Sequence, residues 1–450
     1  MPSDFKASNT QLPTISYARL LTEMHRLIGE GKGDSEEAEA LADRMDGPWY
    51  AMTGQEQARM RGLAGDLNAM RDGGPKRVEM TPEALTEWQG AMREAFARSE
   101  AADEDKALNF LRQPVPAGLP RHFIPFLQAR CWERLGDLET ALVFMKEADR
   151  LDPDHALSVL TLLQKLGRVD ELPHYADRVI ANPTSPPLEL YLAAVAWLAL
   201  TRQIGDAEAA PILRKAEAVL KRALLGYLAL PIPKREESPP DSDAHIAQAL
   251  GLILERLGDQ KSAIDVYSEA IARHPRNGEL YMGRGLALFG VDLPRALADL
   301  RAAARLDVAA IWPYLLLARQ ALQSAAPGEA LRFALAAEQQ PGPAPARAEV
   351  YEAIAISLAE LGQPQERVLE NFDKALALDP TNARIRENRE IAASLVPPSR
   401  PGRAGRSRLR HPPPFKPEGL RMARSDQIEN RKELLNEYHN NRVKRELVAG

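Results

Sequence analysis

The 450-residue sequence predicts an all-α protein, a right-handed α-solenoid of helical hairpins with an N-terminal helical region and a disordered basic C-terminal tail. Two observations predict this fold: a two-helix pattern recurs in distant segments, and the 35 prolines fall largely at the ends of predicted helices or in the tail. The sequence contains one cysteine. A hydrophobic fraction of 45% excludes a wholly disordered chain. A single thiol excludes an internal disulfide, so we expect a reducing, cytoplasmic setting.

The recurring pattern is centred on a Gly-Asp pair. A small residue lies seven positions before each glycine, and four further positions match at offsets of 5, 9, 12 and 17. The first copy contains Ala129, Gly136, Ala141, Met145, Ala148 and Pro153, and the second contains Gly251, Gly258, Ala263, Tyr267, Ala270 and Pro275. Because small residues on both sides of a turn let two antiparallel helices approach closely, each copy predicts a helical hairpin.

The polar residues of the pattern predict where each second helix begins and ends. The short carboxylates of Asp137 and Asp259 can accept hydrogen bonds from the unpaired N–H groups of the first helical turn. Pro153 and Pro275 end the same helix, because proline lacks an N–H group and clashes with the preceding turn. A hairpin of this kind has an unfinished apolar face, so neighbouring copies must stack.

This pattern resembles the tetratricopeptide repeat, a helix–turn–helix unit of about 34 residues. Residues 311–343 and 348–382 keep most of the pattern, and degenerate copies occupy 156–185, with a shortened first helix, 187–224, with a lengthened first helix, and 278–310. The resemblance covers about residues 122–382. It implies a scaffold that binds other proteins and no particular activity.

Composition shifts divide the chain further. Residues 1–112 form a predicted N-terminal helical region, with helices near 15–29, 35–45 and 103–112 and two more opened by Thr53 and Thr81; this region resembles the leader of bacterial tetratricopeptide proteins. The other predicted parts are a first sub-array at 122–230, a Pro-rich loop at 231–243, a second sub-array with a capping helix at 244–396, a basic disordered linker at 397–424 and a marginal helix at 425–450.

The predicted partner-binding residues lie on the first helices of the hairpins. In proteins that this array resembles, these helices line a concave groove, and the matching positions here are Phe123, Phe126, Arg130, Gln248, Met282, Leu286, Phe289, Trp312 and Arg319. Aromatic residues, methionine and arginine are enriched in interfaces. The sequence therefore predicts that the groove binds an extended or helical apolar peptide of another protein. The alternative for each residue is packing between helices.

The C-terminal segment has the opposite charge to the rest of the chain. Residues 400–450 contain 13 Lys and Arg and 6 Asp and Glu, a net charge of +7, so residues 1–399 sum to −12. An arginine-rich tail can neutralise phosphates and release counterions. The alternative function is thus nucleic-acid binding by the tail, and the competing interpretation is a solvated linker or an arm that docks on the acidic body. The candidate polyanion-binding residues are Arg400, Arg403, Arg406, Arg408 and Arg410.

Motifs for catalysis, cofactors and metals are not recognisable in the sequence. The eight histidines are scattered, without an HExxH motif or a His-Cys cluster, so we expect no metal site and no cofactor. Cys131 would be reactive if exposed beside Arg130, but burial in a helix is the commoner state. The less favoured alternative is an enzyme with a site between the N-terminal region and the first hairpins. The longest apolar run, Leu190 to Leu200, is too short to span a bilayer.

Overall fold

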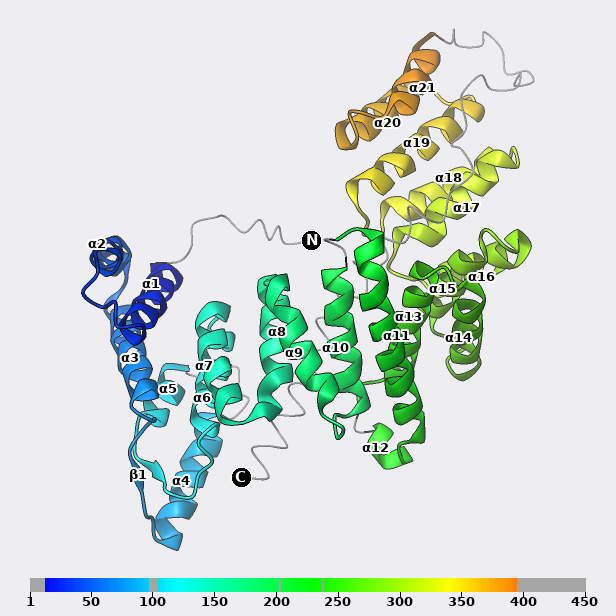
Figure 1. The fold of residues 1–450 in the computed structure, drawn as a ribbon. Helices are drawn as coiled ribbons and strands as arrows, with labels where there is room; N and C mark the ends of the chain where they lie inside the picture. Colours follow the sequence, from blue (N-terminus) through cyan, green and yellow to red (C-terminus); the bar gives the residue numbers. More distant parts are fainter. Residues whose placement is uncertain (1–12, 97–103, 202–203, 237, 395–450) are drawn as a thin grey trace. The chain divides into compact units, whose positions relative to one another are not determined.

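The computed structural model describes residues 13–96, 104–201, 204–236 and 238–394. These residues form α-helices with one short strand pairing, which confirms the all-α prediction (Figure 1). They divide into two compact units, separated in the sequence between Ser185 and Pro186. The predicted linker at 397–424 and the predicted helix at 425–450 lie outside the described residues.

Unit 1 contains the N-terminal helices and the first two hairpins. Its helices are α1 (Pro13–Gly29), α2 (Glu36–Ala51), α3 (Gly54–Arg71), α4 (Pro82–Ala95), α5 (Glu104–Leu111), α6 (Phe123–Arg134), α7 (Leu138–Leu151), α8 (Ala156–Leu166) and α9 (Leu172–Ala181), with short 3-10 turns at Pro153–His155 and Val169–Glu171.

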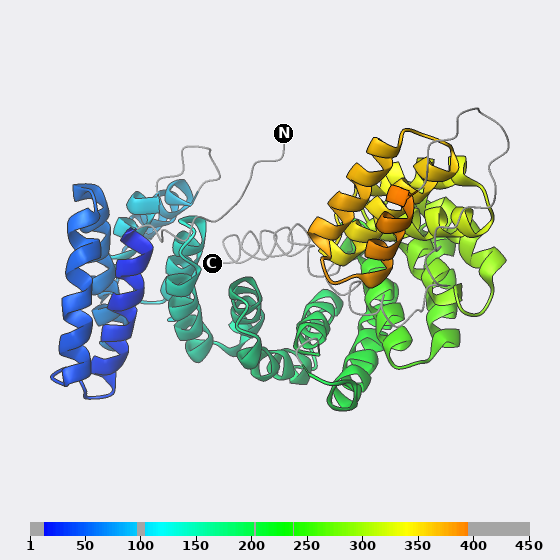
Figure 2. The ribbon, with the colours of Figure 1, turned by 90° about the horizontal axis from the view of Figure 1, so that it is seen from above.

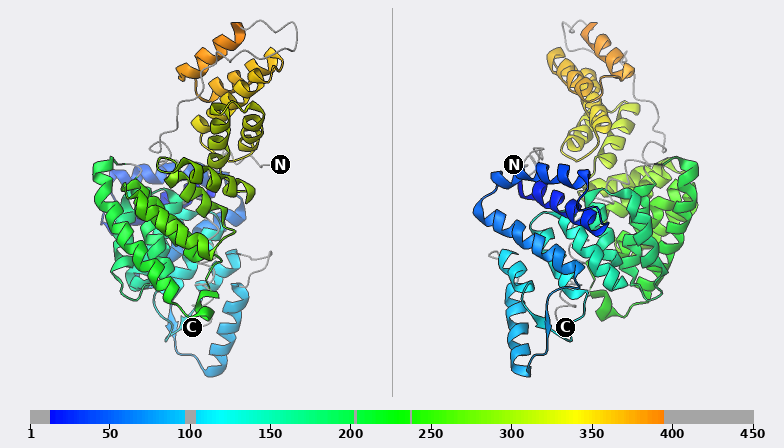
Figure 3. Two further views of the ribbon diagram at one scale, coloured as in Figure 1. Left: turned by 90° about the vertical axis from the view of Figure 1, so that its right-hand side faces the viewer. Right: turned by 60° about the vertical axis from the view of Figure 1, so that its left-hand side comes forward.

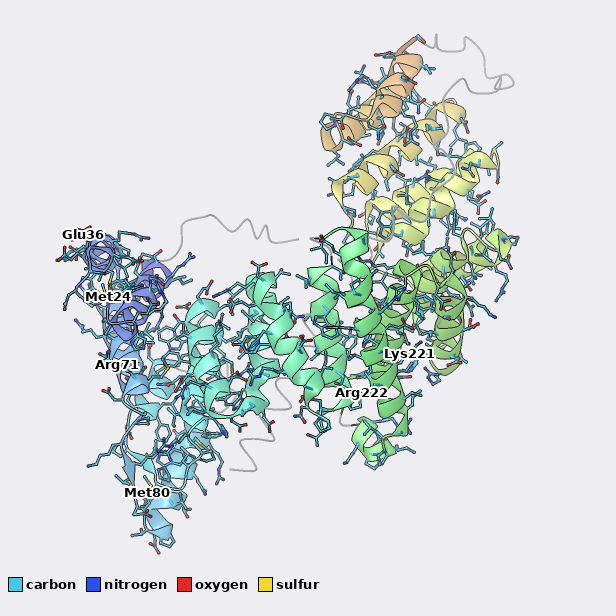
Figure 4. The ribbon with its side chains drawn as sticks, viewed as in Figure 1. Met24, Glu36, Arg71, Met80, Lys221 and Arg222 are labelled. Atoms are coloured by element: carbon cyan, nitrogen blue, oxygen red, sulfur yellow. The ribbon has the colours of Figure 1, made fainter. Side chains whose placement is uncertain are left out.

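The N-terminal bundle is formed by α1, α2 and α3, with α1 packed against the other two (Figure 3). Thr53 and Glu56 form the predicted capping box at the start of α3. Figure 4 labels Met24 on α1 and Arg71 at the end of α3. The pKa of the neighbouring His25 is lowered, first by burial and then by the charge of Arg71. Apolar side chains close the bundle, with Leu27, Ala38 and Leu41 buried between α1 and α2.

Two details of unit 1 differ from the prediction. Helix α2 continues through Pro48 to Ala51, although an internal proline removes one backbone hydrogen bond of the helix. The Trp49 ring then lies 5.2 Å from that of Tyr17, between α1 and α2.

The strands β1 (Arg77–Val78) and β2 (Val115–Pro116), which pair in parallel, were also not predicted. Two residues are too few to give an alternating pattern in a sequence.

Unit 2 is a row of hairpins from α10 to α21. The helices are α10 (Pro187–Leu200), α11 (Asp206–Ala229), α12 (Ile232–Glu236), α13 (Ser242–Arg256), α14 (Gln260–Arg273), α15 (Gly278–Leu288), α16 (Leu293–Arg305), α17 (Ile311–Gln323), α18 (Pro327–Glu338), α19 (Ala344–Glu360), α20 (Gln365–Leu378) and α21 (Ala383–Ser394). Figure 2 shows the last of these, α19 to α21, side by side.

The hairpin turns have the predicted geometry. Gly136 and Gly258 both adopt φ of +83°, a left-handed conformation that favours glycine. The carboxylates of Asp137 and Asp259 accept a hydrogen bond at 3.1 Å from the backbone N–H three residues later. The second helices end at Leu151 and Arg273, two residues before Pro153 and Pro275. Local sequence signals therefore set these boundaries.

Two predicted features of unit 2 need correction. The hairpin at 187–224 has its extra length in the second helix, since α10 has 14 residues and α11 has 24. The Pro-rich segment 231–243 contains the short helix α12 and lies within unit 2, because α13 packs against α10 and α11 across it. The predicted capping helix is present as α21, with Ile385 and Ala392 buried as expected. No helix in the described part of the chain is long and apolar enough to cross a membrane.

Candidate partner-binding site

The predicted groove residues are distributed over both units. Phe123, Phe126 and Arg130 lie on α6 of unit 1, whereas the other six lie in unit 2: Gln248 on α13, Met282 and Leu286 on α15, Phe289 just after it, and Trp312 and Arg319 on α17. The structure thus brings these residues together in two separate sets, each on the first helices of its own hairpins.

Most of these side chains are buried. Met282, Leu286 and Phe126 are each only 2% exposed, and Phe123, Gln248, Trp312 and Arg319 also lie in the interior. The helices α13 and α17 are buried on nearly all faces, which is typical of helices packed between neighbours on both sides. Only Arg130 and Phe289 keep a larger exposed part. In this conformation, few of the predicted apolar side chains are therefore accessible to a partner protein.

Charged side chains connect the first helices of two successive hairpins, α17 and α19, and the capping helix α21. Arg319 on α17 donates to Glu349 on α19 at 2.7 Å. Glu352, one helical turn further along α19, accepts from Arg384 of α21 at 2.6 Å and from Asn388 at 3.0 Å. The partners are separated by 30 to 36 residues, close to one hairpin repeat. We call Arg319, Glu349, Glu352, Arg384 and Asn388 the inner charged cluster.

Burial changes the acid–base behaviour of the inner charged cluster. The Glu352 side chain is 1% exposed, and burial raises its pKa to about 7 despite the opposing charge of Arg384. Burial likewise lowers the pKa of Arg319, although Glu349 opposes this effect. A carboxyl group that titrates near neutral pH makes this region of unit 2 sensitive to protonation.

A pocket of about 430 Å³ lies beside α12, at the Pro-rich segment of unit 2. It is lined by Tyr227, Leu228, Arg235, Glu236, Ser238, Pro239, Pro240, Asp241, Asp243, Arg273 and His274. The lining comes from α11, α12, α13 and α14 and from the segment between α12 and α13. We call it the α12 pocket.

Oppositely charged groups converge in the α12 pocket. The His274 ring lies between two carboxylates, with Nδ1 3.1 Å from Asp241 and Nε2 2.8 Å from Asp243. Arg273 also pairs with Asp243, at 2.9 Å. Each ring nitrogen of His274 therefore faces a carboxylate oxygen within hydrogen-bond distance. Asp241 adopts the left-handed conformation, with φ of +56°, which aspartate tolerates better than most residues.

Arg235 is the basic residue of the pocket that is held by the backbone. Its Nε donates to the Leu230 carbonyl at 2.9 Å. A guanidinium fixed in this way can present its remaining N–H groups to a carboxylate or a backbone carbonyl. Arg235 was not predicted because 231–243 was expected to be only a loop. His274 was not predicted because its partners, Asp241 and Asp243, lie about one repeat earlier in the sequence. The sequence feature that could have predicted these charged clusters is the occurrence of oppositely charged residues about one repeat apart.

Cys131 occupies the junction of α5 and α6, the region of the enzyme alternative. Its side chain is fully buried, and burial raises the pKa of the thiol to about 12, with the carboxylate of Glu104 acting in the same direction. Arg134 pairs with Glu104 at 2.6 Å at the same junction. A neutral, buried thiol is a poor nucleophile, so Cys131 contributes packing and not reactivity.

Comparison with known proteins identifies the repeat. The tetratricopeptide repeat family model matches residues 244–277, which are α13, α14 and their flanks. No curated protein sequence matches the chain. A solved tetratricopeptide repeat protein from Parabacteroides merdae is 14% identical with a TM-score of 0.36, over 68% of this chain and 99% of that one.

Two further solved structures are similar over long stretches. Human IFIT1, as a dimer with PPP-AAAA, is 11% identical with a TM-score of 0.38, over 85% of this chain and 84% of that one. YrrB, a tetratricopeptide repeat protein with an unusual peptide-binding site, is 14% identical with a TM-score of 0.22, over 60% and 92%. The stacked hairpins define a helical-repeat protein. With the family model matched at α13 and α14, the chain contains a tetratricopeptide repeat at residues 244–277.

Proposed function

We propose that this protein is a non-catalytic interaction scaffold, which binds a peptide or helix of a partner protein on the first helices of its hairpins. The observation that carries the proposal is the α12 pocket, which places Arg235, Arg273 and His274 beside the first helix of the matched repeat. Interfaces of stacked repeats commonly combine an extended surface with a few anchoring groups.

The charges of the pocket suggest what the anchor recognises. Asp241 and Asp243 are paired with His274 and Arg273, and Glu236 also lines the pocket, whereas the Nε of Arg235 donates to the Leu230 carbonyl. We therefore expect the bound segment to present a carboxylate, from an acidic side chain or a chain terminus.

The experiment starts with affinity purification of the full chain and identification of the partner. Binding of the purified partner is then measured by calorimetry for the wild type and for the double variant Arg235→Ala, Arg273→Ala. We expect the double variant to weaken binding by about tenfold or more, because charge-assisted hydrogen bonds contribute about 1.5–3 kcal/mol each. The control is Arg332→Ala, an exposed arginine of α18. Equal affinity of the double variant and the control would exclude the pocket as the anchor.

A second candidate function rests on the arginines between 400 and 410. Five arginines within eleven residues are a strong electrostatic site for a polyanion. We propose nucleic-acid binding by this arginine-rich tail as the alternative function. A chain that ends at Pro397 separates the two proposals, because it keeps the α12 pocket and loses every arginine of the tail.

A further inference from the structure

Unit 1 brings together three side chains with metal-binding atoms: His122, Asp152 and His155. One ligand atom of each lies within 4.8 Å of the other two. His122 immediately precedes α6, and Asp152 follows α7, 30 residues later. His155 ends the 3-10 turn Pro153–His155, and Asp152 is the N-cap of that turn. The turn between α7 and α8 thus lies against the start of α6.

The geometry of the three side chains suits a transition-metal ion. His122 Nδ1 lies 3.0 Å from Asp152 Oδ2. Around a tetrahedral Zn²⁺ ion with bonds of about 2.0 Å, ligand atoms lie about 3.3 Å apart. The side chains of His122 and Asp152 are 24% and 31% exposed, so they can rotate by the small amount that closes the set around an ion.

The surroundings hold the ligands in place. The other carboxylate oxygen of Asp152, Oδ1, accepts a hydrogen bond from the backbone N–H of Asp154 at 3.1 Å. Oδ2 is therefore the oxygen presented to His122, and outer contacts of this type orient metal ligands. His155 is 2% exposed, and its ring stacks on Phe126 at 4.9 Å. The backbone N–H of His155 also donates to the Asp152 carbonyl at 3.2 Å.

We propose that His122, Asp152 and His155 bind a divalent transition-metal ion, with zinc as the best match. Two imidazoles and one carboxylate form a ligand set that zinc uses with a fourth position open to water or to a further ligand. The partial exposure of His122 and Asp152 gives the ion a path to the buried imidazole of His155. A bound ion ties the start of α6 to the turn between α7 and α8, and so fixes the first hairpin against the next.

A search for short sequence motifs does not detect this metal site, because its ligands come from both ends of one hairpin. Zinc motifs are recognised by short spacings, such as HExxH. Here only the pair Asp152 and His155 is close in the sequence, and His122 lies a whole hairpin earlier. The repeat geometry, which returns the chain to the same edge after two helices, brings them together.

The test is a titration of the full chain with Zn²⁺ after treatment with a chelator. Calorimetry and thermal unfolding are measured for the wild type, for Asp152→Asn, His122→Ala and His155→Ala, and for His174→Ala as the control. His174 lies exposed on α9 of the same unit. We expect one high-affinity zinc per chain and a rise in Tm for the wild type and for His174→Ala, because an ion that binds only the folded state stabilises it.

Loss of a ligand should weaken zinc binding by about 100-fold or more and remove the rise in Tm. Asp152→Asn and His122→Ala change partly exposed side chains, so they test the site even if His155→Ala does not fold. With Co²⁺ as the probe, visible absorption bands should appear in the wild type and be lost in Asp152→Asn. The proposal is overturned if the wild type binds no zinc, or if zinc binds to Asp152→Asn and His122→Ala as tightly as to the wild type.

Discussion

The ring of Tyr267 occupies the space where any side chain at Gly251 would lie. A Cβ atom at Gly251 would come within 2.3 Å of the Tyr267 Cζ atom, and one at Gly283 would come within 2.6 Å of Cε1 of the same ring. The ring is fully buried, and its hydroxyl donates to Glu255 at 2.9 Å. Helices α13, α14 and α15 are therefore held together by one aromatic residue between two glycines.

Replacement of Gly251 by alanine should destabilise unit 2 by about 1–3 kcal/mol, because a buried ring cannot move away without disturbing its neighbours. Thermal or urea unfolding of the variant measures this loss. Gly328→Ala on α18 is the matched control, since a Cβ there meets no atom within 4 Å. A Gly251→Ala variant as stable as the control would show that the Tyr267 ring does not determine the helix spacing.

The stability of unit 2 should depend on the protonation of Glu352. Its folded-state pKa of about 7 lies above the ordinary value of 4.5, so the folded state binds the proton more tightly than the unfolded chain. The resulting stabilisation, about 3 kcal/mol, is complete below pH 4.5 and is lost as the pH rises through 7.

Unfolding measured from pH 4.5 to 8 tests this dependence. Glu352→Gln should remove most of it, because glutamine resembles the protonated acid at all pH values. Glu370→Gln on the exposed face of α20 should keep it, since the pKa of Glu370 is lowered by Lys374 and not raised. If the Glu352→Gln variant and the wild type have parallel stability profiles, burial does not control this carboxyl group.

The N-terminal bundle should depend on the ion pair between Arg112 and Asp66. Arg112 follows α5 and donates two hydrogen bonds, at 2.9 and 2.7 Å, to the buried Asp66 carboxylate of α3. Arg112→Met leaves that carboxylate buried and unpaired, at a cost of about 3–5 kcal/mol. Adding Asp66→Asn to the variant should recover much of the loss. Arg71→Met, which affects an exposed arginine, should change stability by less than about 1 kcal/mol.

Cys131 should resist thiol reagents in the folded protein. The thiol is buried, and its pKa of about 12 keeps it protonated at neutral pH. We expect a chromogenic disulfide reagent to label no thiol under native conditions and one thiol per chain in denaturant, with native labelling no faster than unfolding. Rapid native labelling would place Cys131 at the surface and revive the enzyme alternative.

Nucleic-acid binding, if the tail provides it, should weaken steeply with salt. Replacement of Arg400, Arg403, Arg406, Arg408 and Arg410 by glutamine removes five positive charges. For a single-stranded oligonucleotide this should reduce the slope of log K against log salt concentration by about 3 to 4. Fluorescence anisotropy at several salt concentrations measures the slope, and an unchanged slope would exclude these arginines from phosphate contact.

Local sequence features predicted much of the fold. Thr53 and Glu56 are three residues apart, and Asp137 lies three residues before the N–H group that it caps. Each of these signals acts within one helical turn, so the sequence contains it in full. The repeat of the Gly-Asp pattern then predicted the hairpins. The length of α11 and the path of α2 through Pro48 were not predictable, because packing outweighed the local preferences there.

By itself, the sequence determined the all-α class, the hairpin boundaries at Gly136 and Gly258, and the need for a small residue at Gly251. Only the tertiary structure decided which side chains are buried and which distant charges meet. Trp312 and Arg319 have the residue types of an interface but lie in the interior. Glu352 meets Arg384, and His122 meets Asp152 and His155, across about one repeat. The physical reason is that burial and ligand geometry depend on the stacking of hairpins, whereas helix ends depend on neighbouring residues in the chain.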